Sequence, residues 1–473
     1  YGEKSTMKAE NVEDIYELTP VQKGMLFHCL YASESALYFF HHTLTLHGNP
    51  NVEAFEQAWQ QVVDRHTVLR TGFYWEDIDN PLQVVYKQVK ITLNQDDWRG
   101  VEEAEQQERL KLFLESDRKL GFDFSQPCLM RITLIRLADE RYEFIWSNHH
   151  ITTDGWSGPI ILEECLQIYE ALCDCKEVNL LPTRPFRNYI DWLQQQSITK
   201  TESFWREALQ GVKAPTPLTY IENNQLSNQE ERYDEEMIKL SEATTKSLLS
   251  FATKNRLTLA TLVNGIWSIL LSRYTCRNNI IYGFTVTGRP VDLAEVESMV
   301  GMFINTLPIN VKLNTEQQLL SWLQDFQIQL VKARHHEYTP LTQIQGWSEV
   351  PRNLPLFETI VVVENFPVSQ FLKRWKGNIE FELTGTYYRN NYPLNLVIYP
   401  EAEIIVAISY DSRRFDIATI TGIISDFQIL LQEIMTNPYA QIKDLSFSTS
   451  QQQQISTSLE KEALFDWKLA PMS

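Results

Sequence analysis

A polar stretch in the first half of the chain has residue types that could carry out acid–base chemistry. It reads NHHITTDGWSGP, with His149 and His150 adjacent and Asp154 and Gly155 following. An imidazole whose pKa lies near ~6.5 can accept a proton at neutral pH, so a histidine on a rigid element is a candidate general base. The same residues could instead bind a metal, or form a buried pair that only satisfies hydrogen bonds.

Two further chemical interpretations fit this stretch less well. A metal site would use His150 and Asp154 at i and i+4, but that spacing suits a helix, and nothing in the sequence nominates a third ligand. We therefore expect no metal. Residues 155–158 nearly spell the GxSxG turn of serine hydrolases, but the second glycine comes one position early and Pro159 follows, so the nucleophile turn is not met.

A strand and a turn must position these residues. Residues 141–148, RYEFIWSN, are a β-type run that ends at the histidines, and Asp154-Gly155 is typical of a turn. Because successive strand side chains point to opposite faces, only one of the two histidines can point into a given cleft. The chain has two other such pairs, His41-His42 and His335-His336, so the dipeptide alone indicates no function.

Helical and β-type patterns alternate in both halves of the chain. Helical periodicity is clear at residues 54–66, 158–173, 314–336 and 416–435, and β-type runs lie at 39–48, 126–137, 279–288, 359–366 and 401–410. Thr315 and Gln318 read as a capping box for the third helix. The alternation predicts an α/β or α+β fold with at least two sheet-containing lobes. Residues 211–235, rich in Pro, Asn, Gln and charge, predict an internal linker.

Length and composition limit the class of protein. A chain of 473 residues is too long for one ordinary core, and 42 basic against 61 acidic residues give a net charge of −19, which argues against binding nucleic acid or an anionic membrane. The six cysteines are scattered without a CxxC pair, which favours a reducing compartment. The N-terminus lacks the apolar core of a signal peptide, and we find no run near the ~20 apolar residues of a membrane span. We expect a cytoplasmic segment of a longer protein.

Six motifs together resemble the condensation domains of nonribosomal peptide synthetases. The histidine stretch matches the family signature HHxxxDG, and the other motifs follow in family order from Val12 to Phe447. They are LTPVQKGMLFH at 18–28, RHTVLRTGF at 65–73, YGFTVTGRP with VESMVGMFINTLP between 282 and 308, HHEYTPLTQIQ at 335–345 and RNLPLFETIVVVENFP at 352–367.

The resemblance implies a fold and a domain division. Its fold is two chloramphenicol-acetyltransferase-like lobes arranged as a V-shaped pseudo-dimer, with a tunnel at their junction. We accordingly expect an N-terminal lobe at 1–185, a C-terminal lobe at 186–447, and a linker at 448–473 toward a downstream adenylation domain.

The resemblance also implies a reaction and its central residues. An aminoacyl amine on a downstream carrier would attack an acyl or peptidyl thioester on an upstream carrier, and His150 would take up the proton or position the reactants. Aligning two tethered substrates can lower the barrier by up to ~7–11 kcal/mol, whereas a general base typically accelerates a reaction by only ~10²–10⁴-fold. Alignment can therefore outweigh proton transfer, and we expect the effect of His150 on the rate to differ between substrates. By the same resemblance Asp154 is structural and pairs with Arg289, an ion pair that would join the histidine loop to the second lobe.

Other residues have open alternatives. His149 is expected to pack or to support the site, and Gly155 to permit a backbone conformation or a close approach. Arg65, like Arg70, either supports the active-site loop or is a helix-end cation favoured by the helix dipole.

Three more residues are predicted to line the substrate tunnel. Trp156 and Ser157 adjoin the histidine motif. Asn305 could donate to substrate or hold a crossover strand in place.

Related domains supply the alternatives to condensation. Epimerisation domains usually have an EGHGR-like motif, which we do not find here, and heterocyclisation domains replace the histidines with DxxxxD. A non-catalytic carrier-docking platform is a further alternative. The GMLFH opening and the RHTVLRT motif resemble the subclass that joins a D-configured donor to an L-acceptor.

The resemblance also implies partners and cofactors. We expect upstream and downstream peptidyl carrier proteins, an adenylation domain downstream in cis, and an upstream epimerisation domain if the donor is D-configured. The excised domain is expected to be a monomer and to bind no cofactor itself, since phosphopantetheine arms of the carriers deliver the substrates.

Overall fold

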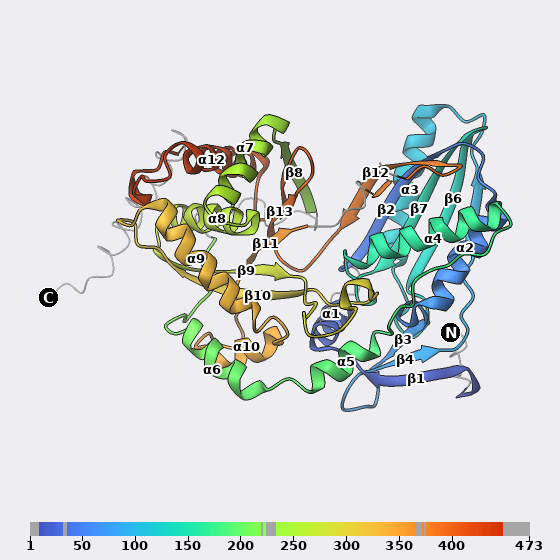
Figure 1. Cartoon of the computed structure of the whole chain (residues 1–473), viewed down its shortest axis with the longest axis horizontal. Coiled ribbons are helices and arrows are strands. Elements are labelled where there is room, and N and C mark those ends of the chain that lie inside the picture. The colour runs from blue at the N-terminus through green and yellow to red at the C-terminus, as the bar shows by residue number, and fades with distance from the viewer. Residues whose placement is uncertain are drawn as a thin grey trace. The chain divides into compact units, whose positions relative to one another are not determined.

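The computed structural model describes residues 9–31, 36–218, 221–223, 233–364, 371–372 and 375–447. These residues form alternating helices and strands (Figure 1), so the mixed α/β class predicted from the periodicity is observed. The predicted connector at 448–473 lies outside the described residues.

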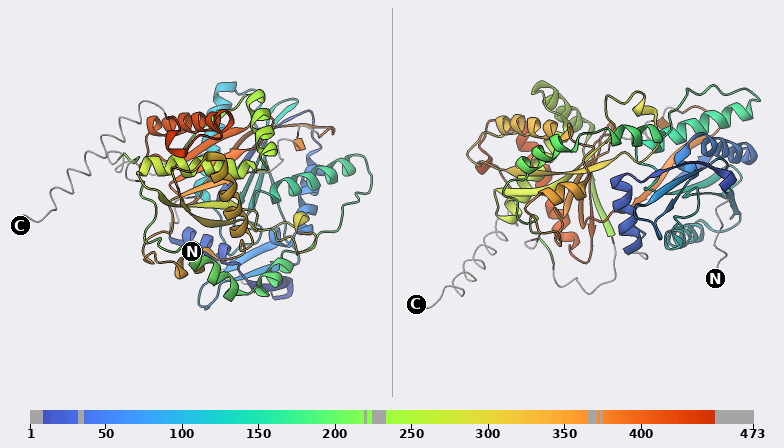
Figure 2. Two further views of the ribbon diagram at one scale, coloured as in Figure 1. Left: turned by 60° about the vertical axis from the view of Figure 1, so that its left-hand side comes forward. Right: turned by 90° about the horizontal axis from the view of Figure 1, so that it is seen from below.

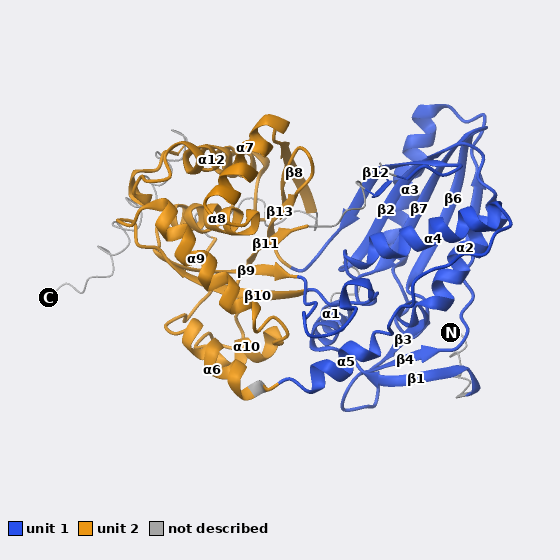
Figure 3. Cartoon of the chain, in the orientation of Figure 1, with its two compact units in different colours: residues 1–196, 287–304, 366–391 blue, residues 197–286, 305–365, 392–473 orange. Residues whose placement is uncertain are grey.

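The chain divides into two compact units, and neither is continuous in sequence (Figure 3). The first contains residues 1–196, 287–304 and 366–391, and the second contains 197–286, 305–365 and 392–473. The first boundary thus falls at 196 rather than at the predicted 185, and two later segments return to the first unit, which the sequence pattern did not indicate.

The first unit holds two sheets. A five-stranded sheet has the order β12-β2-β7-β6-β5, and a three-stranded sheet has the order β1-β4-β3. Its strands are β1 (Val12–Glu17), β2 (Phe39–His47), β3 (Thr71–Tyr74), β4 (Leu82–Tyr86), β5 (Leu93–Asp97), β6 (Met130–Ala138), β7 (Arg141–His149) and β12 (Glu380–Tyr388). Its helices are α1 (Pro20–Tyr31), α2 (Val52–Arg65), α3 (Glu103–Leu120), α4 (Ser157–Cys173) and α5 (Arg187–Gln194).

Helices cover both faces of the five-stranded sheet. Asn51 caps α2 by accepting a hydrogen bond from the amide of Ala54 at 3.1 Å. Apolar residues of α2 and α4 pack with Phe144 and Trp146 of β7, whereas Ile145, which points to the other face, packs with α3. Figure 2 (right) shows α3 and α4 on opposite sides of this sheet. β7 is therefore a central strand that is packed on both faces and paired on both edges.

The second unit contains one six-stranded sheet, ordered β10-β9-β11-β13-β14-β8. Its strands are β8 (Tyr233–Lys239), β9 (Asn279–Val286), β10 (Asn305–Lys312), β11 (Thr359–Val363), β13 (Leu394–Tyr399) and β14 (Ile405–Asp411). Its helices are α6 (Ile198–Ala208), α7 (Glu242–Lys254), α8 (Leu259–Thr275), α9 (Leu319–Arg334), α10 (Leu341–Trp347) and α12 (Ile417–Thr436).

Helix α12 is a core helix. Within the part of the chain that the structure describes, it alone is long and apolar enough to cross a membrane by length and composition. Asp416 caps it by accepting from the amide of Thr419 at 2.8 Å, and one face, including Ile420, Phe427 and Leu430, is buried in the second unit's core. Its apolar character is explained by this packing.

Two local expectations were wrong. The capping box at Thr315 and Gln318 does not form, because α9 begins at Leu319 with Gln318 as its N-cap, and Gln318 makes no capping hydrogen bond but pairs with Gln441 in a β-bridge. The described part of 211–235 is not a free linker, since Val212 and Leu218 are buried in the second unit's core.

Candidate functional site

The two histidines lie at the end of β7. This strand is antiparallel to both neighbours, β2 and β6, and His149 is its last residue. The amide of His149 donates to the carbonyl of Leu129 at 3.0 Å, and the amide of His150 donates to the carbonyl of Tyr38 at 2.8 Å. Both backbone positions are thus fixed by neighbouring chain segments.

His149 uses both ring nitrogens within the protein. Nδ1 accepts a hydrogen bond from the amide of Ile151 at 3.1 Å, and Nε2 lies 3.2 Å from the carbonyl oxygen of Leu37. Since a carbonyl can only accept, Nε2 must hold the proton and the ring is neutral. Burial, together with the neighbouring His150, lowers the pKa of His149 to about 3, while the hydrogen bond to the carbonyl of Leu37 acts in the opposite direction. Its position fits the supporting role predicted for it.

His150 has a different environment. Its side chain is buried, and within the described residues its Nδ1 has no hydrogen-bond partner. The ring centroid lies 5.1 Å from that of Tyr388 and 6.3 Å from that of Phe40, both in edge-on contacts. Burial lowers the pKa of His150, while the charge of Asp154 and the carbonyls of His150 and Thr153 act in the opposite direction. The imidazole is therefore neutral near pH 7 and able to accept a proton.

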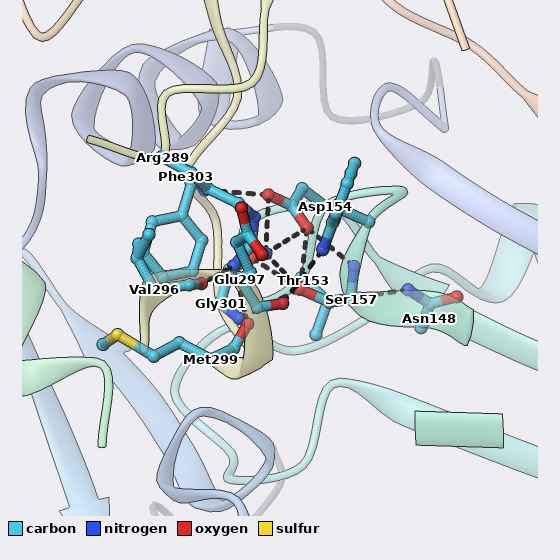
Figure 4. A network of polar contacts seen from close by, with 11 residues as sticks. Asn148, Thr153, Asp154, Ser157, Arg289, Val296, Glu297, Met299, Gly301 and Phe303 are labelled. Carbon is cyan, nitrogen blue, oxygen red and sulfur yellow. Dashed lines mark hydrogen bonds and ion pairs between the residues drawn. The ribbon is translucent and has the colours of Figure 1, made fainter. Parts of the chain in front are cut away.

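Asp154 is the centre of a buried polar network (Figure 4). Its carboxylate is fully buried and accepts from the amide and hydroxyl of Ser157 at 2.9 and 2.7 Å, and from the amide of Phe303 at 3.2 Å. Nη2 of Arg289 lies 3.2 Å from Oδ1. The predicted ion pair between Asp154 and Arg289 is thus observed. Its predicted role in joining the loop to the second lobe is wrong, because residues 287–304 return to the first unit.

Arg289 joins this network to its own segment. Nη1 donates to the carbonyls of Val296 and Met299 at 2.5 and 2.8 Å, and the guanidinium lies 4.0 Å from the centroid of Phe303. Burial lowers the pKa of Arg289, and Asp154 opposes that effect. The amide of Asp154 donates to the carbonyl of Gly301 at 3.0 Å, so backbone and side chain both connect the histidine loop to residues 287–304.

Trp156 and Ser157 contact the same returning segment. The indole nitrogen of Trp156 donates to the carbonyl of Glu297 at 3.0 Å. The Ser157 hydroxyl is fully buried, lies next to the carboxylate of Asp154, and accepts from the amide of Gly301 at 3.0 Å. That hydroxyl is occupied by the network, which argues against a nucleophilic serine. The tunnel role of both residues remains a prediction.

Two other predicted residues, Arg65 and Asn305, have structural partners. Nε of Arg65, in the last turn of α2, donates to Glu164 of α4 at 3.0 Å, so it is both a helix-end cation and a support for the helix after the histidine loop. The Asn305 amide donates to the carbonyls of Glu337 and Thr339, both at 2.8 Å, and so holds the start of β10 in the second unit. Gly155 is not among the described glycines with positive φ, so a left-handed backbone conformation does not explain it.

Two glycines and two aromatic residues were missed by sequence reasoning. Gly288 has a φ of 63°, and a Cβ there would lie 1.8 Å from the carbonyl oxygen of Phe303, so only glycine fits beside Arg289. Gly301 packs directly under the Phe186 ring. Both glycines stand in motifs quoted above, which could have signalled them. The contacts of Phe40 and Tyr388 with His150 depend on strand pairing and had no local signal.

No group of three or more His, Cys, Asp or Glu side chains that could hold a metal occurs among the described residues. The site offers instead a neutral imidazole at a strand end, held by a network that contains no exposed nucleophile.

Comparison with known proteins gives the family. The family profile described as Condensation domain matches residues 12–456. The chain belongs to the condensation-domain family. Two subunits of linear gramicidin synthase from Brevibacillus parabrevis are similar to it, one 40% identical over 457 residues and another 41% identical over 438 residues. These alignments cover 97% and 93% of this chain but only 6% and 8% of the length of those relatives.

Solved structures share the fold. A four-domain nonribosomal peptide synthetase bound to AMP and glycine matches with a TM-score of 0.79 at 19% identity, over 93% of this chain and 34% of that one. The starter condensation domain of rhizomide synthetase matches with a TM-score of 0.76 at 18% identity, over 92% and 98% of the two chains. The predicted class of two acetyltransferase-like α/β lobes is confirmed. Condensation domains catalyse amide-bond formation, an acyltransferase-type reaction, so the predicted enzyme class is confirmed as well.

The Asp154 network predicts a large stability effect. Asp154→Asn keeps the shape of the side chain but leaves the buried Arg289 without a counter-charge, which typically costs about 3–5 kcal/mol. Urea unfolding should show a lower midpoint, and hydrogen exchange should accelerate in residues 287–304. The matched control Glu105→Gln removes an exposed i,i+4 pair with Arg109 and should leave the midpoint unchanged. Equal midpoints for the two variants would contradict this assignment.

His149 predicts a pH dependence of stability. Its pKa is about 3 when folded and near 6.5 when unfolded, so the unfolded state binds more protons between these values. The contribution of neutral His149 to the free energy of unfolding is therefore complete above pH 6.5. It is lost as pH falls below that value, and the free energy of unfolding decreases by up to about 1.4 kcal/mol per pH unit. His149→Gln should lose less stability than the wild type between pH 7.5 and pH 5, measured by urea unfolding. Exposed His335→Gln should behave as the wild type, and identical profiles for all three proteins would refute the prediction.

Proposed function

We infer that this domain forms a peptide bond between two carrier-bound substrates. The observation that carries the proposal is the neutral, buried imidazole of His150 at the end of a central strand, in a chain of the condensation-domain family. The acceptor would be an aminoacyl thioester on a downstream carrier, and the donor an acyl or peptidyl thioester on an upstream carrier.

The reaction requires little covalent chemistry from the protein. The acceptor amine attacks the thioester carbonyl, the C–S bond breaks, and the donor carrier leaves as a free thiol. The amine loses a proton, which the neutral His150 can accept and then pass to the leaving sulfur, so that the carrier departs as a thiol and the imidazole becomes neutral again. A lowered pKa makes His150 a weaker base but keeps it unprotonated over a wider pH range, so positioning and charge stabilisation are expected to contribute alongside proton transfer.

Direct attack by the amine is preferred to an acyl-enzyme. Such an intermediate would need an available nucleophile, and the Ser157 hydroxyl beside the histidine motif is buried and hydrogen-bonded to Asp154. The thioester is already activated, so no covalent relay is needed.

The finer assignments follow from the motifs. GMLFH at 24–28 and RHTVLRT at 65–71 support a D-configured donor residue and an L-acceptor. Trp156, Ser157 and Asn305 are proposed to adjoin the substrate path. We propose a cytoplasmic multidomain parent that supplies the carriers and an adenylation domain in cis, since this chain matches only short parts of the gramicidin synthase subunits.

Peptide-bond formation can be tested with two loaded carrier proteins. The upstream carrier is given an L- or D-aminoacyl donor and the downstream carrier an acceptor, and the intact mass of both is read after adding the domain in deuterated water. We expect dipeptide on the downstream carrier, faster with the D-donor. His150→Ala should lower the rate by about 10²–10⁴-fold for substrates that need base help. His335→Ala is the control.

Two outcomes would overturn the proposal. Deuterium at the α-position of a loaded residue without dipeptide would indicate epimerisation. Carrier binding without either product, from a domain that is folded by its melting curve, would indicate a docking platform. A faster reaction with the L-donor would overturn the donor assignment alone.

A further inference from the structure

A β-bulge in β12 determines which side chain faces His150. In the first part of β12 the pairing with β2 is regular, and Leu383 lies opposite Leu44. The register then shifts, and Gly385 pairs with Thr43, so Tyr388 pairs with Phe40. Without the extra residue Tyr387 would lie opposite Phe40. β-Bulges commonly redirect a side chain beside a functional site.

The bulge is held by specific contacts. The bulged residue is Thr384, whose hydroxyl donates to Oε1 of Glu143 on β7 at 2.9 Å. The other carboxylate oxygen of Glu143 accepts from Thr45 of β2 at 2.9 Å, so one buried carboxylate joins all three strands. A Cβ at Gly385 would lie 2.6 Å from the hydroxyl oxygen of Thr43, so glycine permits the close approach.

The two neighbouring tyrosines consequently have different surroundings. The Tyr387 ring lies 4.5 Å from the guanidinium carbon of Arg118 and 6.3 Å from the ring of His41. The Tyr388 ring lies 5.1 Å from His150 at an interplanar angle of 61°, and 5.5 Å from Phe40. Phe40 completes the contact, at 6.3 Å and 86° to His150. Two aromatic rings thus meet the imidazole.

These aromatic contacts lie beside a ring that has no hydrogen bond on Nδ1 within the described residues, although the carbonyls of His150 and Thr153 act on its pKa. A catalytic histidine is usually oriented by a partner on its second nitrogen, but within the described residues Nδ1 of His150 is buried without one. Ring edges packed against the imidazole restrict its rotation and exclude water. We propose that Tyr388, placed by the bulge, is a positioning residue that holds the His150 ring together with Phe40. The predicted effect on the reaction rate rests on the proposed function, whereas the predicted effect on the orientation of the His150 ring does not.

The test compares Tyr388→Ala with Tyr388→Phe and with the matched control Tyr387→Ala. The chain has 9 histidines, so ¹⁵N-histidine NMR can resolve them, and His150→Gln assigns the signal. Tyr388→Ala should shift the His150 resonances and raise its pKa toward the ordinary value, because water reaches the ring. Other ionisable groups near the ring are Asp154 and His149, and all three variants retain them.

The kinetic readout separates positioning from folding or binding. Tyr388→Ala should lower kcat by about 10–100-fold, as expected for a misplaced catalytic group, with little change in KM for either carrier. Tyr388→Phe should keep most activity, and Tyr387→Ala should leave the His150 resonances unchanged. The proposal is overturned if Tyr388→Ala and Tyr387→Ala give the same His150 spectra and titration. A wild-type domain that forms no dipeptide would overturn the proposed function, and the His150 spectra would still decide the role of Tyr388.

Discussion

The buried ion pair between Asp154 and Arg289 is the interaction on which the histidine loop depends. Neither charge reaches solvent to any useful extent, so each needs the other and needs further hydrogen bonds. The Asp154 carboxylate has donors from Ser157 and Phe303, and Arg289 donates to two backbone carbonyls. Because these partners come from residues 154–157 and 287–304, the network fixes the loop only once the distant segment has returned.

The adjacent histidines have become different groups through their surroundings. Both ring nitrogens of His149 are hydrogen-bonded to backbone groups, which fixes its tautomer. His150 is fixed through its backbone amide and through ring contacts, so its imidazole keeps an unused nitrogen. Burial lowers the pKa of both, so both are neutral near pH 7. Only His150 has a ring nitrogen without a hydrogen bond within the described residues, which is consistent with the different roles proposed for the two histidines.

Most of the residues around His150 are explained by geometry rather than by direct chemistry. Asp154, Ser157 and Arg289 hold the loop, Arg65 supports the following helix through Glu164, and Gly288 allows the returning segment to approach. This distribution agrees with the energetics of the proposed reaction. A thioester and a neutral amine react readily once aligned, so rigid placement of the reactants and of one imidazole can outweigh the proton transfer.

The sequence alone determined the periodic elements, the α/β class, the family resemblance and the Asp154–Arg289 pairing, because motifs and residue periodicity are local or family-wide patterns. Helices α2, α4 and α12 and strands β2, β7 and β9 lie close to where periodicity placed them. Tertiary structure alone decided that residues 287–304 and 366–391 join the first unit. It also decided, through strand register, that Tyr388 rather than Tyr387 meets His150. A one-residue bulge moves every later side chain of the strand to the opposite face of the sheet. This bulge is stabilised by the hydrogen bond between Thr384 and Glu143, which are far apart in sequence.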